Sequence, residues 1–167
     1  MILDHPLISH RYFFPRAESV DPPVIISADG ADLHCFQSQY PNSGPVMLHF
    51  HGNGEVVADY TGPIDRAFSE CGVNTTFVEY RGYGGSSGTP QLGKMLADTK
   101  SVIESLEIDP TNLWVFGRSV GSIYAIEVAR RYPQLKGLII ESGIADPLQR
   151  LLLRMEPSEL GASLKDL

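Results

Sequence analysis

Short apolar runs alternate with helical spacing from residue 46 onwards. The runs fall at 46–50, 74–80, 113–116 and 135–141. Between them, apolar residues over 92–106 recur three and four positions apart, which is typical of an amphipathic helix. Strands that alternate with helices favour a parallel sheet with crossover helices. The pattern therefore predicts an α/β fold, a mostly parallel sheet with flanking helices.

Helices are expected in each interval between these strands and after the last of them. An irregular apolar pattern places one within 56–71, and another is expected over 120–132. Pro147 opens a final amphipathic helix. Its apolar residues are Leu148, Leu151, Leu152 and Met155. The polar positions of the 92–106 helix, which we expect in solvent, are Lys94, Asp98, Lys100 and Glu104.

The N-terminal part predicts an additional antiparallel ribbon. The aromatic cluster 12–14, followed by Pro15, favours an edge segment that covers the sheet. Two β-prone runs within 24–37 flank Asp29 and Gly30, and an Asp-Gly pair in that setting is a strong hairpin signal. The sheet is therefore expected to begin with a β-hairpin.

Length, composition and charge favour a single globular domain and argue against nucleic-acid binding and a membrane span. A length of 167 residues with 43% hydrophobic content is sufficient for one domain with its own core. Thirteen Lys and Arg against twenty Asp and Glu give a net charge of -7, which argues against nucleic acid as a partner. No apolar run approaches the roughly 20 residues of a membrane span, and Asp4 interrupts the N-terminus before a secretory core. We expect a soluble, cytoplasmic protein.

The sequence contains G-x-S-x-G twice, at 84–88 and 117–121, so the motif alone decides nothing. A nucleophile elbow requires a strand that turns sharply into a helix. Ser119 directly follows the 113–116 strand and precedes a helix. Ser86 is followed by a Thr-Pro pair and a later helix, so we interpret it as part of a loop. Ser119 is therefore the candidate catalytic nucleophile.

A serine nucleophile also needs two N–H groups aimed at the developing oxyanion. The segment His51-Gly52-Asn53-Gly54 leaves the 46–50 strand at the same edge of the sheet. Its glycines allow the backbone to approach a ligand, so the backbone amides of Asn53 and Val120 form the candidate oxyanion hole. A tight strand-to-helix turn without a ligand remains the alternative.

The order of these segments resembles the α/β-hydrolase superfamily, in particular its serine-aminopeptidase-like esterases, lipases and thioesterases. The matching segments are the Asp29-Gly30 hairpin, HGNGE at 51–55, EYRGYGGSSG at 79–88 and GRSVGS at 117–122. The resemblance covers residues 24 to about 147. It implies a single, incomplete hydrolase domain over 1–167, truncated after the strand that follows the nucleophile helix. It also implies hydrolysis of an ester, thioester or amide through an acyl-serine intermediate, with residues 80–84 lining the site.

The chain departs from that family in its catalytic base. The family order is Ser, then Asp or Glu, then His. All five histidines precede Ser119; they are His5, His10, His34, His49 and His51. A serine without an adjacent base is a weak nucleophile. We therefore expect full activity to need further C-terminal residues or a partner chain, and a catalytically inactive hydrolase-like binding module is the alternative.

We expect the other histidine, carboxylate and cysteine side chains to have structural roles. His49 and His51 alternate along one strand, and we expect them to pack beneath the oxyanion loop rather than bind a metal. Glu141 and Asp146 are expected to be solvated rather than to supply the triad acid. No metal-ligand spacing is present, and residues 88–95 only approach a phosphate-binding loop, so no metal or cofactor is predicted. Cys35 and Cys71 are expected to be buried, inert thiols.

The last predicted strand has an edge that we expect another segment or chain to cover. Ending the chain soon after 135–141 leaves one strand edge open for pairing. The residues after Pro147 could fold back over it, a second copy could pair with it, or a separate polypeptide could add the absent strands.

Overall fold

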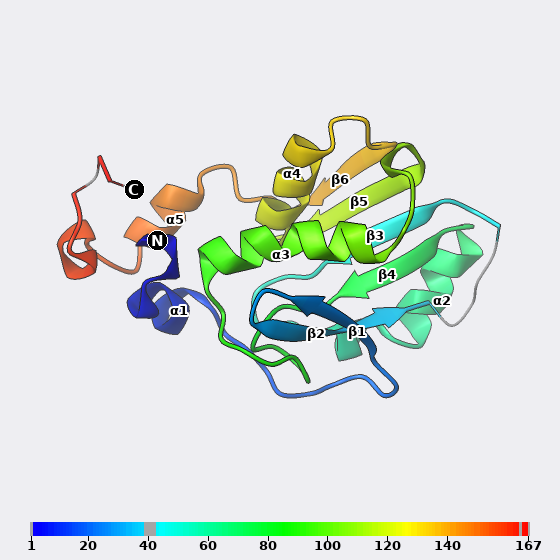
Figure 1. Cartoon of the computed structure of the whole chain (residues 1–167), viewed down its shortest axis with the longest axis horizontal. Coiled ribbons are helices and arrows are strands. Elements are labelled where there is room, and N and C mark those ends of the chain that lie inside the picture. Colours follow the sequence, from blue (N-terminus) through cyan, green and yellow to red (C-terminus); the bar gives the residue numbers. More distant parts are fainter. Residues whose placement is uncertain (1, 39–42, 164, 167) are drawn as a thin grey trace.

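The computed structural model describes residues 2–38, 43–163 and 165–166, and a six-stranded sheet is at the centre of this part of the chain (Figure 1). The strand order is β1-β2-β4-β3-β5-β6. Strands β3 to β6 are parallel, and β2 joins β4 in an antiparallel pair. The predicted α/β fold with an N-terminal hairpin is therefore confirmed. The strands are β1 (Val24–Ala28), β2 (Ala31–Gln37), β3 (Val46–Phe50), β4 (Asn74–Val78), β5 (Leu113–Arg118) and β6 (Gly137–Glu141).

Helices cover both faces of the sheet (Figure 1). On one face, α3 and α4 pack on the sheet through a core that includes Val102, Tyr124 and Val115. On the other face, a second cluster joins Val57 and Phe77. The helices are α1 (Pro6–Tyr12), α2 (Pro63–Glu70), α3 (Leu92–Ser105), α4 (Gly121–Arg131) and α5 (Pro147–Leu152); the 3-10 helices are η1 (Ile2–Asp4), η2 (Val57–Tyr60), η3 (Pro110–Asn112) and η4 (Pro157–Leu160).

Local sequence explains where the elements differ from prediction. The helix expected within 56–71 is split into η2 and α2, because Gly62 adopts a φ of 72° and Pro63 restarts the helix. Strand β6 begins at Gly137 rather than at 135, since the Leu135 N–H donates to the Tyr132 carbonyl in a turn. The helices predicted over 92–106 and 120–132 match α3 and α4 within one residue at each end.

The N-terminal segment contains a helix that the sequence did not predict, over 6–12, and residues 13–20 form neither a helix nor an edge strand. Pro6 occupies the first turn of α1, and the His5 side chain accepts a hydrogen bond from the Leu7 N–H at 3.2 Å. The last residue of α1, Tyr12, and the following Phe13 are buried, whereas Phe14 is exposed. Helix α1 lies beside α5, at the end of the molecule toward which the arrows of β5 and β6 point (Figure 1).

Strand β6 forms an open edge of the sheet, because β5 is its only partner strand among the described residues. Its apolar side chains Leu138, Ile139 and Ile140 are 41%, 40% and 41% exposed. The α5 region does not cover them: Leu151 and Met155 are buried in the main core instead, and α5 lies beside α1 (Figure 1). The possibility that the residues after Pro147 fold back over this strand is therefore wrong.

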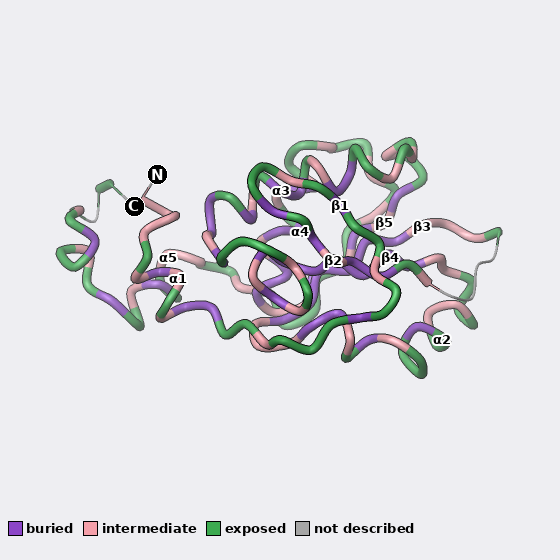
Figure 2. The backbone as a smooth tube through the Cα atoms, turned by 60° about the horizontal axis from the view of Figure 1, so that its bottom comes forward, coloured by how far each residue is buried: buried purple, intermediate pink, exposed green. Residues whose placement is uncertain are grey.

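Burial is concentrated along the central strands (Figure 2). Cys35 lies in β2 and is fully buried, and this burial raises the pKa of its thiol to about 12. Cys71 directly follows α2 and is exposed, so the expectation that both thiols are buried is wrong for Cys71. Within the described part of the chain, no helix is both long and apolar enough to cross a membrane.

Candidate active site

Ser119 occupies a sharp turn between β5 and α4. Its φ of 50° lies in the left-handed region, which non-glycine residues rarely adopt. Hydrogen bonds hold this turn: the Ser119 N–H donates to the Glu141 carbonyl at 2.9 Å, and the Ser122 N–H donates to the Ser119 carbonyl at 3.0 Å. The Ser122 hydroxyl donates to the same carbonyl at 2.6 Å. The local backbone has the strained strand-to-helix form of a nucleophile elbow.

Two glycines allow the turn to pack closely. A Cβ atom at Gly121 would collide with the carbonyl oxygen of Phe50 at the end of β3. A Cβ atom at Gly117 would lie 2.6 Å from the Cβ of Ala125 in α4. The glycines of the motif are thus required by the approach of β3, β5 and α4 around Ser119.

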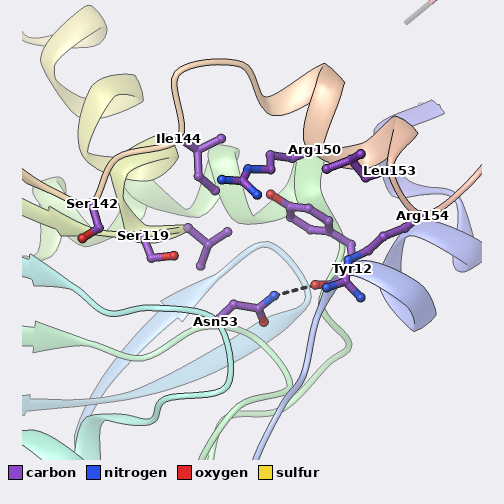
Figure 3. A pocket seen from close by; sticks show the side chains of 9 residues that line it. Tyr12, Asn53, Ser119, Ser142, Ile144, Arg150, Leu153 and Arg154 are labelled. Carbon is purple, nitrogen blue, oxygen red and sulfur yellow. Dashed lines mark hydrogen bonds between the residues drawn. The ribbon is translucent and has the colours of Figure 1, made fainter.

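A pocket of 460 Å³ opens beside Ser119 (Figure 3). Ser119, Val120 and Asn53 form its floor, at the carboxyl ends of β5 and β3. The walls come from both ends of the chain, from α1 and from the segment after β6. The wall residues are Tyr12, Ser142, Ile144, Arg150, Leu153 and Arg154.

The loop after β3 is fixed through the Asn53 side chain. Its amide group donates to the Tyr12 carbonyl at 2.5 Å, and its oxygen accepts from the Phe14 N–H and the Tyr83 hydroxyl, both at 2.9 Å. The backbone N–H groups of Asn53 and Val120 donate to no acceptor among the described residues. Two unused amides therefore border the pocket near Ser119.

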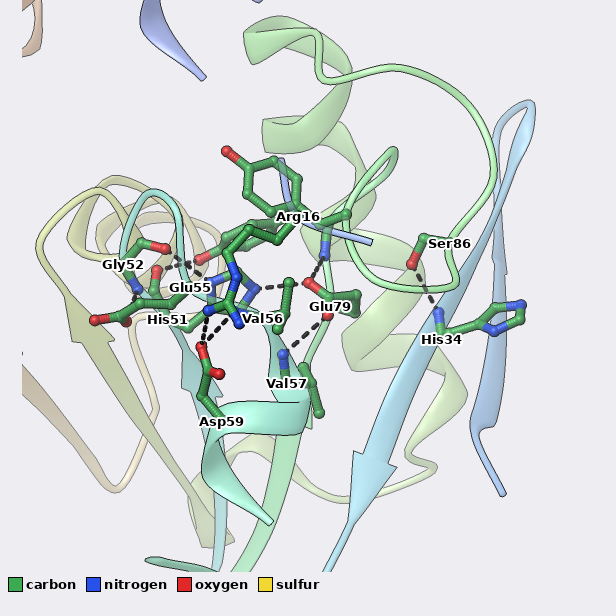
Figure 4. Close-up of polar contacts among 12 residues, drawn as sticks. Arg16, His34, His51, Gly52, Glu55, Val56, Val57, Asp59, Glu79 and Ser86 are labelled. Atoms are coloured by element: carbon green, nitrogen blue, oxygen red, sulfur yellow. Dashed lines mark hydrogen bonds and ion pairs between the residues drawn. The ribbon is translucent and has the colours of Figure 1, made fainter. Parts of the chain in front are cut away.

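A buried polar network supports this loop from below (Figure 4). The His51 Nε2 atom lies 2.8 Å from a Glu79 carboxylate oxygen, and its Nδ1 atom lies 2.9 Å from the Gly52 carbonyl. The N–H groups of Val57 and Tyr80 donate to the Glu79 carboxylate at 2.9 and 3.1 Å. His51 is thus engaged beneath the loop, as the sequence indicated.

His49 lies elsewhere than expected, in an aromatic layer on the α2 face of the sheet. Its ring stacks on Phe116 at a centroid distance of 4.9 Å and lies 4.4 Å from Tyr60. Burial is the main cause that lowers the pKa of His49 to about 3, and electrostatic interactions with His51 and Arg118 act in the same direction. His49 is therefore neutral at physiological pH.

Residues 80–84 support the pocket but do not line it, so that expectation is corrected. Tyr80 is buried and donates its hydroxyl to the His51 carbonyl at 2.7 Å, while Tyr83 bonds to Asn53. Arg81 is turned to the opposite side, where it forms a bidentate pair with Asp98. Asp98 is therefore buried rather than in solvent, contrary to the helix pattern.

The other sequence candidates have local structural roles. The Ser86 hydroxyl accepts a hydrogen bond from the His34 N–H at 2.9 Å, which agrees with its interpretation as part of a loop. Glu141 is exposed and pairs with Arg118 at 3.4 Å. Asp146 is exposed and caps α5, accepting from the Gln149 N–H at 2.9 Å. Among the described residues, none of the pocket-lining side chains is a histidine, and no hydrogen bond joins the Ser119 hydroxyl to another group.

Sequence reasoning missed the wall of the pocket. Tyr12 was visible only as one of three aromatic residues, and nothing local indicates that α1 reaches the carboxyl edge of the sheet. Arg150 and Arg154 gave a weak signal, since positions four apart lie on one side of a helical turn. Their approach to Ser119 is a property of the tertiary structure alone.

Comparison with known proteins gives the family. The model of the family described as serine aminopeptidase, S33, matches residues 42–160. The chain belongs to this family. As an α/β hydrolase it is similar to protein bem46 of Schizosaccharomyces pombe, with 34% identity over 112 residues, 64% of this chain and 37% of that protein.

The chain is also similar to a second curated protein and to a solved structure. The lysophosphatidylserine lipase ABHD12 of Danio rerio is 29% identical over 107 residues, 62% of this chain and 28% of that protein. The crystal structure of an alpha-beta hydrolase from Vibrio vulnificus has a TM-score of 0.59 and 26% identity, covering 70% of this chain and 43% of that chain. The chain spans less than half the length of these three proteins.

Proposed function

We propose that the chain is the nucleophile-bearing part of a serine hydrolase acting on an ester, thioester or amide. The observation that carries this proposal is Ser119 itself, held at a φ of 50° on the floor of a 460 Å³ pocket. The Ser119 oxygen attacks the substrate carbonyl carbon and forms an acyl-serine, while the leaving group departs with a proton. Water then hydrolyses the acyl-serine and restores the hydroxyl.

The developing negative charge on the carbonyl oxygen is received by the backbone N–H groups of Asn53 and Val120. Support comes from the absence of other acceptors for these amides among the described residues. Fixed donors stabilise the transition state because they need no reorganisation during the reaction. The three hydrogen bonds of the Asn53 side chain hold one of these donors in place.

The proton of the Ser119 hydroxyl requires a base that the described pocket residues do not supply. We propose that a C-terminal extension or a partner chain provides it, together with the acid that orients it. The greater length of the relatives supports this view. Without a base, only the oxyanion hole and binding contribute, which leaves rates about 10³ to 10⁴ above water.

A fluorophosphonate probe tests the proposal, because it reacts with activated serines. We expect slow labelling of the chain alone, abolished in Ser119→Ala and retained in Ser86→Ala, whose serine belongs to a loop. Labelling that persists in Ser119→Ala would refute the assignment.

A catalytically inactive binding module is the second candidate function. The lack of a histidine among the described pocket residues favours it. No labelling of Ser119 under any condition, combined with retained ligand binding in the pocket, would support this alternative.

A further inference from the structure

The pocket beside Ser119 carries positive charge inside an acidic chain. Of the described residues that line it, Arg150 and Arg154 are the charged ones, and neither Asp nor Glu occurs among them. The whole chain has a net charge of -7, so the pocket locally reverses the sign. A concave wall of one sign concentrates ligands of the opposite sign.

The guanidinium groups of these two residues have no carboxylate partner in the described structure. Arg154 donates to the Arg11 carbonyl at 3.3 Å, and its guanidinium lies 5.0 Å from the ring centroid of Phe14. These contacts orient the group and leave most of its five N–H donors unused. The Arg150 side chain makes no hydrogen bond to a described residue. By contrast, the neighbouring Arg11 pairs with Glu159 at 2.9 Å.

Tyr12 adds a neutral donor between the arginines and the elbow. Its side chain is buried, and its hydroxyl points into the pocket toward Arg150 (Figure 3). Burial raises the pKa of Tyr12 although the charges of Arg150 and Arg154 act against this, so the hydroxyl keeps its proton at neutral pH. The Tyr12 hydroxyl therefore contributes a hydrogen-bond donor and no competing negative charge.

We infer that Arg150 and Arg154 form an anion-binding subsite, so that the pocket takes substrates carrying a phosphate or carboxylate group near the scissile bond. This inference rests on the proposed function, because it names the substrate class of the Ser119 pocket. Guanidinium groups with free N–H donors bind both anions through paired hydrogen bonds. Ser119 and the two arginines border the same 460 Å³ cavity, so an ester of modest size can reach both.

Isothermal titration calorimetry with small amphiphiles tests this inference without requiring hydrolysis. The probes are hexyl phosphate, hexanoate and 1-hexanol, which share an apolar chain and differ in charge. We expect at least one of the two anions to bind about tenfold more tightly than 1-hexanol. Tighter binding of hexyl phosphate would indicate a phosphate headgroup, and tighter binding of hexanoate would indicate a carboxylate.

Three variants separate the subsite from general effects. Arg150→Gln and Arg154→Gln should each weaken anion binding by about three- to tenfold and leave 1-hexanol unchanged. Lys136→Gln removes an exposed positive charge outside the pocket and should leave all affinities unchanged.

The binding experiment does not depend on the Ser119 hydroxyl. Ser119→Ala should retain anion binding, so a chain that binds anions but fails to react with the fluorophosphonate refutes the proposed function alone. Equal affinity for the anions and 1-hexanol would overturn the anion subsite. An equal loss of affinity in Lys136→Gln and in the two arginine variants would overturn it as well.

Discussion

His49 is a titratable side chain enclosed by aromatic rings. It is 2% exposed, and its Nδ1 atom has no hydrogen-bond partner in the described structure. Protonation would place a charge in this layer, close to the positive guanidinium of Arg118. The folded state therefore binds this proton far less readily than the unfolded chain, which links stability to pH.

We predict that His49 makes the fold sensitive to acid. Its pKa is about 3 in the folded state and about 6.5 when unfolded, so the unfolded chain binds an extra proton between these values. The free energy of unfolding should thus fall as the pH drops below 6.5, by about 2 kcal/mol between pH 7 and pH 5 from this group. Urea unfolding of His49→Phe at both pH values should show the wild-type drop reduced by that amount.

His10 provides the control for this experiment, because it is an exposed histidine on α1. His10→Gln should keep the pH dependence of the wild type. The same pH dependence in His49→Phe would contradict the role assigned to His49.

At the scale of residues, the sequence predicted those roles that depend on the neighbouring residues in the chain. Ser119 could be distinguished from Ser86 because only Ser119 joins a strand directly to a helix. Asp98 could not be predicted as buried, since its partner Arg81 lies 17 positions away and is brought to it by the turn after β4. Hydrophobic periodicity assigns polar residues to solvent and carries no information about such partners.

At the scale of elements, the Arg81–Asp98 pair joins three parts of the fold. Arg81 follows β4, Asp98 lies on α3, and a further Arg81 N–H donates to the Asp29 carbonyl in the β1–β2 turn at 2.9 Å. Both side chains are largely removed from water. The pair therefore fixes the position of α3 relative to the hairpin.

We predict that Asp98→Ala strongly destabilises the fold. The substitution leaves the Arg81 charge buried without its partner, which costs about 3 to 5 kcal/mol. Glu104→Ala on the exposed side of α3 removes only a surface pair with Lys100 and should cost less than about 1 kcal/mol. Urea denaturation measures both, and equal effects of the two substitutions would contradict the prediction.

Elements with strong patterns were predicted best. The apolar stripe of α3 and the alternation of strands and helices predicted the bounds of the central strands and helices to within a few residues. Helix α1 was missed because it has only seven residues, too few for a periodic pattern. Its start depends on the His5 cap and Pro6, and these signals are weak without a periodic apolar pattern behind them.

At the scale of the whole molecule, one edge of β6 pairs with no described strand and lies beside three partly exposed apolar residues. Such an edge pairs readily with another strand. We propose that the open edge of β6 (Gly137–Glu141) is an interface, for which a second copy or a partner chain is the occupant. In the isolated protein only a second copy is available.

We predict concentration-dependent self-association of the isolated chain. Light scattering at micromolar concentration should give a mass above the 18.3 kDa of one copy. Ile139→Lys should shift the protein toward the monomer, because a charge at an edge strand opposes pairing. Ile126→Lys, at an exposed isoleucine of α4, should leave the association unchanged. A wild-type mass of one copy at every concentration would refute self-pairing.

The pocket has a floor and a wall of different origin. The floor belongs to the central strands and the elbow, whereas the wall is built by α1 and by the residues around α5. Substitutions in the wall can therefore alter which molecules enter while the strained serine and its neighbouring amides keep their geometry. In the proposed hydrolase, such a division would allow selection to change the preferred substrate without rebuilding the turn at Ser119, and it makes residues 147–154 the natural target for engineering a new specificity.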